Sequence, residues 1–231
     1  MIHFAGLQKL TLLDVPGSTA ATLFTAACNL RCPFCHNASL VPPDAPAPLS
    51  GEAVLDYLRR RQGLLDAVCI TGGEPLLQPL APFLEKVHAL GYRIKLDTNG
   101  TLPGTLMELV RAGLVDQVAM DIKSGPSGYA RACGLPRMDL GEIRKSVDFL
   151  LSGTLPFEFR TTVVRGLHTP EDLLELAEWI AGNEPYFLQA FVRSEDIPDA
   201  TLEAFPAPEM EAMRQQILPF LPMAQLRGIS L

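Results

Sequence analysis

The sequence predicts an α/β fold, and three observations lead to this prediction. The 231 residues are 48% hydrophobic and 19% charged, a composition typical of a globular chain that can bury a proper core. Short apolar runs alternate with helix-like segments six times along the chain. A polar motif follows each apolar run, where the predicted strand ends. We therefore expect one domain over residues 1–231, with six parallel strands and right-handed crossovers arranged as a TIM-like partial (β/α)6 barrel.

The first predicted strand leads directly into a cluster of cysteines. An N-terminal extension of residues 1–19 contains a Pro16-Gly17 turn signal, and the apolar residues 20–27 are expected to form a buried strand. A proline-rich loop at residues 41–49 should stay extended, because proline also restricts the residue before it. Ser50 is the expected N-cap of a helix that ends near residue 62.

Five further strand and helix patterns complete the predicted fold. The strands are expected at residues 66–71, 92–98, 114–122, 157–164 and 186–192. The helices are expected at residues 80–90, 103–112, 139–152, 170–181 and 207–218. The carboxyl ends of parallel strands meet at one rim, where such folds bind their ligands. The polar motifs at these strand ends should therefore converge on one site.

Cys28, Cys32 and Cys35 are the clearest candidates for metal ligands. A structural zinc site normally takes four ligands, often as two cysteine pairs, and no second pair is present. A disulfide among these three cysteines would leave one thiol unpaired. A four-iron cluster held by three thiolates would leave one iron open to a small molecule. Three reduced structural cysteines remain the alternative interpretation.

Three further strand ends carry motifs with candidate ligand-binding residues. Gly72 and Gly73 would let a ligand approach the backbone closely beside the carboxylate of Glu74, although Gly-Gly is also common in ordinary turns. Asp97 precedes an Asn-Gly turn dipeptide, and Asp121 with Lys123 could be only a surface ion pair. The two aspartates could also share a cation, because hard oxygen ligands suit one.

The Cys-x3-Cys-x2-Cys spacing, with an aromatic residue before the last cysteine, resembles the radical S-adenosylmethionine superfamily. This resemblance implies that Cys28, Cys32 and Cys35 hold one [4Fe-4S] cluster and that the open iron chelates S-adenosyl-L-methionine. It also implies that the Gly72-Gly73-Glu74 motif holds the amino group of that cofactor. A similarity of Asp97 and of Asp121 with Lys123 to the glycyl-radical-enzyme activating enzymes implies that these residues line the cofactor site and that Lys123 meets the carboxylate. The full set of expected cofactor contacts is Phe34, Cys35, His36, Gly72, Gly73, Glu74, Asp97, Thr98, Asp121, Ile122, Lys123 and Gln189. Gln189 stands where the wider group often has a histidine.

Over nearly all of residues 6–192 the chain resembles a narrower family. The runs 6–9, 13–17, 28–37, 95–101, 119–123 and 158–164 are similar to those of the activating proteins of anaerobic ribonucleoside-triphosphate reductase, a group related to pyruvate formate-lyase activase. The resemblance implies an enzyme that accepts an electron from flavodoxin or ferredoxin and cleaves S-adenosylmethionine reductively. The resulting 5′-deoxyadenosyl radical would take hydrogen from a glycine of the partner reductase, leaving a glycyl radical. No protein side chain would act as the catalytic group.

Other functions are weighed against this one. A 7-carboxy-7-deazaguanine synthase also carries a Thr-Gly-Gly-Glu-Pro motif, another glycyl radical enzyme could be the partner, and a noncatalytic iron–sulfur or zinc scaffold would need only the cysteines. The net charge of −7 argues against a nucleic-acid partner, and no apolar run approaches the roughly 18 residues of a membrane span. The N-terminus lacks the pattern of a signal peptide, and clustered cysteines fit a reducing compartment, so we expect a cytoplasmic protein.

Overall fold

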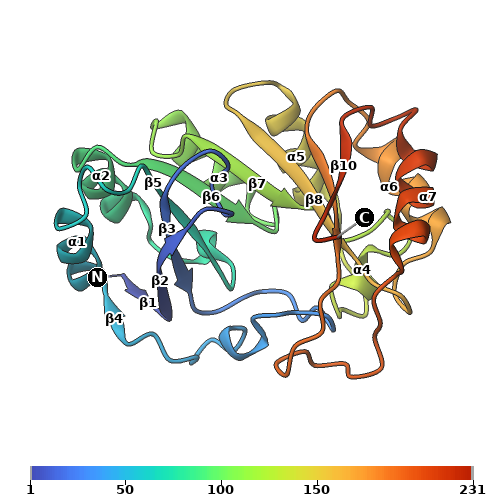
Figure 1. Ribbon diagram of the computed structural model, residues 1–231, viewed down its shortest axis with the longest axis horizontal. Coiled ribbons are helices and arrows are strands. Elements are labelled where there is room, and N and C mark those ends of the chain that lie inside the picture. The colour runs from blue at the N-terminus through green and yellow to red at the C-terminus, as the bar shows by residue number, and fades with distance from the viewer. Residues whose placement is uncertain (1, 230–231) are drawn as a thin grey trace.

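The computed structural model, which describes residues 2–229, confirms an α/β fold built on a mostly parallel sheet (Figure 1). The sheet has eight strands in the order β10-β9-β8-β7-β6-β5-β3-β2. Its strands are β2 (Gly6–Thr11), β3 (Ala20–Thr25), β5 (Ala67–Gly72), β6 (Arg93–Thr98), β7 (Gln117–Asp121), β8 (Phe157–Val163), β9 (Tyr186–Ala190) and β10 (Ala224–Arg227). Two short antiparallel strands, β1 (His3–Phe4) and β4 (Leu49–Ser50), form a separate pair.

The helices follow the strands in the alternation that the sequence predicts. They are α1 (Gly51–Arg59), α2 (Ala81–Ala89), α3 (Pro103–Arg111), α4 (Tyr129–Ala132), α5 (Gly141–Leu151), α6 (Pro170–Trp179) and α7 (Ala207–Ile217), with 3₁₀ turns at Ala38–Leu40 and Pro75–Leu77. Ser50 caps α1 as expected, because its hydroxyl accepts a hydrogen bond from the Ala53 amide at 3.2 Å. Between residues 2 and 229 no helix is long and apolar enough to cross a bilayer.

All six predicted strands are present within a few residues of their expected bounds, and two further strands border them. β2 pairs antiparallel with β3, and β10 pairs parallel with β9. Both are edge strands, and β2 carries a register irregularity between Gln8 and Thr11. Their pairing depends on tertiary contacts more than on local sequence, which explains why the pattern of residues did not reveal them.

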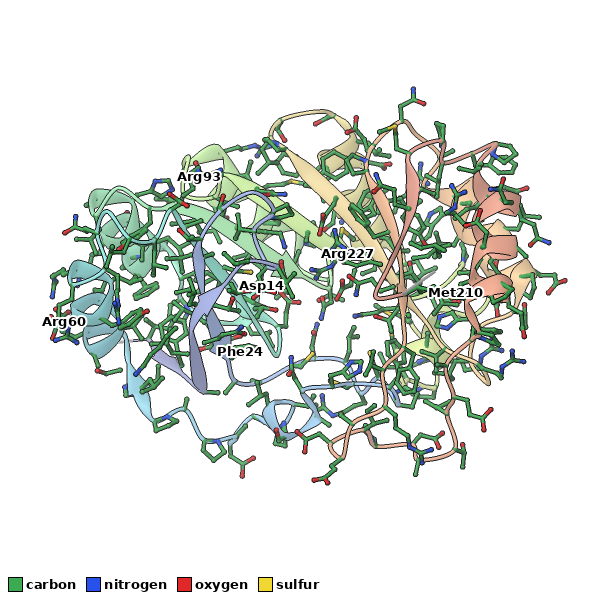
Figure 2. The ribbon with its side chains drawn as sticks, in the orientation of Figure 1. Asp14, Phe24, Arg60, Arg93, Met210 and Arg227 are labelled. Atoms are coloured by element: carbon green, nitrogen blue, oxygen red, sulfur yellow. The ribbon has the colours of Figure 1, made fainter. Side chains whose placement is uncertain are left out.

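The inner face of the sheet carries charged side chains, because residues alternate between the two faces of each strand. On β6, Ile94 and Leu96 are buried in the hydrophobic core, whereas Lys95 and Asp97 form ion pairs with other inward-facing groups. Arg227 of β10, labelled in Figure 2, pairs through both terminal nitrogens with Glu158 of β8 at 3.1 Å. Charged residues from separate strands thus meet inside the curved sheet.

Candidate active site

The predicted cysteine ligands lie on one loop that follows β3. Ala27 begins this loop with a φ of 68°, in the left-handed region that residues other than glycine rarely adopt. The Cys28 amide donates to the carbonyl of Val41 at 3.1 Å, and the Arg31 amide donates to that of Cys133 at 2.9 Å. Because two other segments fix the loop in this way, the strained backbone at Ala27 is held in place.

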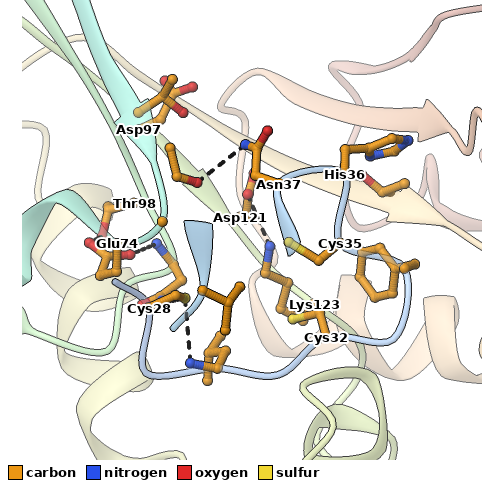
Figure 3. Close-up of a pocket in the computed structure, with 18 of the residues that line it drawn as sticks. Cys28, Cys32, Cys35, His36, Asn37, Glu74, Asp97, Thr98, Asp121 and Lys123 are labelled. Carbon is orange, nitrogen blue, oxygen red and sulfur yellow. Dashed lines mark hydrogen bonds and ion pairs between the residues drawn. The ribbon is translucent and has the colours of Figure 1, made fainter. Parts of the chain in front are cut away.

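All three thiols line a single cavity of about 240 Å³ at the carboxyl ends of the strands (Figure 3). Each sulfur has a hydrogen-bond donor nearby. The Leu30 amide donates to Cys28 at 3.4 Å, the backbone of Asn37 donates to Cys35, and the side chain of Cys133 contacts Cys32. This last contact lowers the pKa of Cys32 to about 7, whereas burial raises the pKa of Cys28 and of Cys35. The loop therefore presents three free thiols toward one space.

The two glycines at the end of β5 allow the cysteine loop to approach the sheet. A Cβ atom on Gly73 would lie 2.0 Å from the Ala27 carbonyl oxygen, and Gly72 has a φ of 114°. No other residue type would fit at Gly73 without moving the backbone of the loop. The glycines thus explain how two distant motifs come to line one cavity.

Glu74 is almost fully buried at the edge of the cavity, with 1% of its surface exposed. Its carboxylate accepts hydrogen bonds from the Thr98 hydroxyl at 2.8 Å and from the Asn99 and Leu76 amides at 2.7 and 3.1 Å. Burial raises the pKa of Glu74 to about 7, against the hydrogen bonds, which lower it. The carboxylate is therefore held in a fixed position, and a bound cationic group would favour its ionised form.

Asp97 and Asp121 lie on the same side of the cavity and are joined by Arg160 of β8. The Arg160 Nε donates to Asp121 at 2.9 Å, and its Nη1 donates to Asp97 at 3.1 Å. Lys95 also contacts Asp97 at 2.8 Å, and Lys123 contacts Asp121 at 3.0 Å. The structure therefore does not support the shared cation that the sequence suggested, because a guanidinium group already bridges the two carboxylates.

Four of these five side chains line the cavity, where the cations Lys123 and Arg160 face the two aspartates, with the carboxylate of Glu74 nearby. Burial alone would raise the pKa of each aspartate, but Arg160 and the neighbouring lysine lower both pKa values below the ordinary one. The pKa of Lys123 is raised despite burial, because Asp121 stabilises its charge. Asp97, Asp121, Lys123 and Arg160 therefore stay charged near neutral pH, and the two cations are the groups of the cavity that could meet an anionic group such as a carboxylate.

Most of the other predicted contacts also line the cavity, namely Phe34, His36, Thr98 and Gln189. Ile122 does not: its side chain is fully buried in the hydrophobic core, because the alternation along this segment turns only its neighbours toward the cavity. The His36 ring contacts the Val192 carbonyl, and Lys123 lies 6.0 Å from the centre of the Phe34 ring.

Sequence reasoning missed two residues that shape the site. Arg160 stands in strand β8, FEFRTTV, where polar residues at 158, 160 and 162 alternate with mostly apolar ones, and this period-two pattern was the available signal. His168 carried no such signal. Its Nε2 pairs with the Lys123 carbonyl at 2.8 Å while its Nδ1 accepts from the Val164 amide at 3.1 Å, so it supports the segment that carries Lys123.

Comparison with known proteins adds sequence relatives to this geometry. A protein of Methanocaldococcus jannaschii named "Putative glycyl-radical enzyme activating enzyme" is 30% identical over 219 residues, which are 91% of this chain and 88% of that protein. A 7-carboxy-7-deazaguanine synthase of Hyperthermus butylicus is 43% identical, but over only 89 residues, which are 38% of this chain and 37% of the synthase.

A solved structure with a similar fold and a family model that matches the sequence add to these relatives. The crystal structure of SuiB from Streptococcus suis shares the fold with a TM-score of 0.69 at 13% identity, covering 90% of this chain and 48% of SuiB. The model of the Radical SAM superfamily matches residues 22–180, which include the cysteine loop and every strand end that lines the cavity except that of β9. The predicted superfamily is thus confirmed, and the chain belongs to the Radical SAM superfamily.

Proposed function

We propose that this protein is an activating enzyme of a glycyl radical enzyme, and that its partner is an anaerobic ribonucleoside-triphosphate reductase. The observation that carries the proposal is the similarity to the Methanocaldococcus jannaschii protein along 91% of the chain. The shorter match to the deazaguanine synthase leaves more than half of the chain without a counterpart. The choice of this reductase as partner rests on the sequence motifs alone.

Membership of the superfamily implies a [4Fe-4S] cluster and S-adenosylmethionine, and the residues of the cavity fit both groups. The three free thiols of Cys28, Cys32 and Cys35 line the cavity together, which suits a cluster with one iron left for the cofactor. When bound, the cluster and S-adenosylmethionine would supply the radical chemistry that removes a hydrogen atom from a glycine.

The protein's own residues would bind and orient the cofactor. Lys123 and Arg160 are the cationic side chains of the cavity that could meet the carboxylate of the cofactor, and the buried carboxylate of Glu74 suits an amino group. Asp97 and Asp121 hold the two cations in place through bonds of 2.9–3.1 Å, so little reorganisation would be required on binding. The roles of these side chains follow from charge and burial.

The decisive experiment mixes the anaerobically loaded protein with the reductase, S-adenosylmethionine and a chemical reductant. A doublet electron-paramagnetic-resonance signal should form on the reductase, and a Gly→Ala change at its radical site should erase the doublet. Cys32→Ser should abolish the signal, whereas the matched variant Cys69→Ser should retain it, because Cys69 is buried in β5 and does not line the cavity. A signal on a different glycyl radical enzyme only would keep the activase and reject the named partner.

A synthase-like small-molecule enzyme is the second candidate, favoured by the 43% identity over 89 residues. The same loaded protein can be incubated with the pterin substrate of that reaction in place of a protein partner. Consumption of the pterin without any radical on a glycyl radical enzyme would replace the activase proposal with this one. Flavodoxin and ferredoxin, the proposed electron donors, can be compared with the chemical reductant in either assay.

A further inference from the structure

A fourth cysteine lies against the predicted ligand Cys32. Cys133 is the C-cap residue of α4, far from Cys32 in the sequence, yet its side chain is in hydrogen-bonding contact with that of Cys32. Cys133 is completely buried, and only 8% of the Cys32 surface is exposed. The contact is therefore inside the protein, where water does not compete for it.

The backbone fixes Cys133 in this position. The Arg31 amide donates to the Cys133 carbonyl at 2.9 Å, which joins the end of α4 to the residue before Cys32. The next residue, Gly134, has a φ of 66°, and a Cβ atom there would lie 2.0 Å from the Arg31 carbonyl oxygen. The two segments are thus in close backbone contact, and the approach of the two sulfurs does not depend on one flexible side chain.

We propose that Cys133 donates an S–H hydrogen bond to the sulfur of Cys32 when Cys32 holds the cluster, and thereby raises the reduction potential of that cluster. Reduction adds negative charge to the cluster, and a donor to a ligand sulfur stabilises the more negative state. Cys133 is then a positioning and tuning residue, because it acts through Cys32 and does not bind iron. The inference rests on the proposed cluster ligation by Cys32, which iron analysis tests separately.

The test is an electron-paramagnetic-resonance redox titration of the full-length, anaerobically loaded protein. Cys133→Ala removes the donor, and Cys133→Ser keeps one in a side chain of similar size. At a fixed potential we expect the ratio of reduced to oxidised cluster to be about threefold lower in the alanine variant, which is a midpoint about 28 mV more negative at 59 mV per tenfold change in that ratio. The serine variant should match or exceed the wild-type midpoint. Cys69→Ala, a change at a buried thiol outside the cavity, should leave the midpoint unchanged.

A second pair of variants keeps the proposal testable if the alanine variant does not load iron. Cys133→Thr and Cys133→Val have the same shape, but only threonine has a donor, so the valine variant should show the lower midpoint. If the alanine and serine variants, or the valine and threonine variants, load iron and have equal midpoints, the proposal is overturned while the cluster assignment stays intact. A wild-type protein without iron would overturn the cluster assignment and this inference together.

Discussion

Replacing Arg160 with methionine should destabilise the protein strongly, because Arg160 is the cation that two buried aspartates share. The change keeps an unbranched side chain of comparable length but removes hydrogen bonds of 2.9 Å to Asp121 and 3.1 Å to Asp97. Breaking a buried ion pair by removing one partner costs about 3–5 kcal/mol. Each aspartate keeps one lysine partner, so we expect a loss near the lower end, about 3 kcal/mol.

Urea unfolding of the cluster-free protein, followed by circular dichroism, would measure this loss without a contribution from metal release. For a chain of this size a loss of about 3 kcal/mol corresponds to a fall of about 1 M in the unfolding midpoint. Arg144→Met is the matched control. The Arg144 side chain is 47% exposed and pairs with Asp148 at 2.8 Å on the surface of α5, so its loss should cost less than about 1 kcal/mol.

The cost of Arg160→Met should also depend on pH. Arg160 lowers the pKa of Asp97 and Asp121, and a lowered carboxyl pKa contributes stability that is present above the unfolded value of about 3.9 and is lost as pH falls through the folded value. In the variant the pKa values of Asp97 and Asp121 should rise. Both carboxylates should then be protonated, and so lose their buried charge, already in mildly acidic solution. The difference in free energy of unfolding between wild type and variant should therefore become smaller as the pH falls from 7.5 to 4.5. If Arg160→Met and Arg144→Met lower the free energy of unfolding equally at pH 7.5, this reasoning is refuted.

Three further predictions address other parts of the site. Lys123→Met should weaken S-adenosylmethionine binding by more than about tenfold in calorimetry while cluster absorbance is kept, because a charge-assisted contact is lost; unchanged affinity would remove Lys123 from the site. Gly73→Ala should impair iron loading, because its Cβ would lie 2.0 Å from the backbone of the cysteine loop, whereas Gly104→Ala in α3 has open space around it and should load iron normally. Burial lowers the pKa of His168, so the stability that it contributes should be complete above about pH 6.5 and decline as pH falls through the lowered folded value. His168→Gln should remove that part of the pH dependence of unfolding, and an identical pH profile would contradict the assigned role.

Local sequence patterns predict the elements that bury an apolar face, and the fold confirms them. The strand at residues 66–71 and the helix capped by Ser50 have periodic apolar residues and clear end signals, and both occur within a few residues of the expected bounds. The edge strands β2 and β10 were not predicted, because the register of one is interrupted and the other has four residues. Their stability comes from pairing with neighbours that no local pattern identifies.

The site was predictable where a motif carries its own chemistry and unpredictable where only the fold creates the contact. The spacing of Cys28, Cys32 and Cys35 indicates a ligand set without any knowledge of the fold. By contrast, Cys133 looks incidental in the sequence, since its relation to Cys32 exists only after α4 packs against the cysteine loop. The shared cation near Asp97 was unsupported for a similar reason: its place is taken by Arg160, which comes from a strand two positions away in the sheet from β6.

The pairing of Arg227 with Glu158 has a consequence for how the chain matures during translation. Glu158 lies on β8, is 4% exposed, and forms both of its 3.1 Å bonds with Arg227 of the late strand β10. Because synthesis proceeds from the N-terminus, the strands that hold the cysteine loop emerge from the ribosome well before this arginine does. Until residue 227 has emerged, the nascent sheet contains a carboxylate whose main counter-charge is missing. The inner face of the sheet can therefore reach its final charge balance only once residue 227 has emerged, after all residues proposed to hold the cluster have already been made.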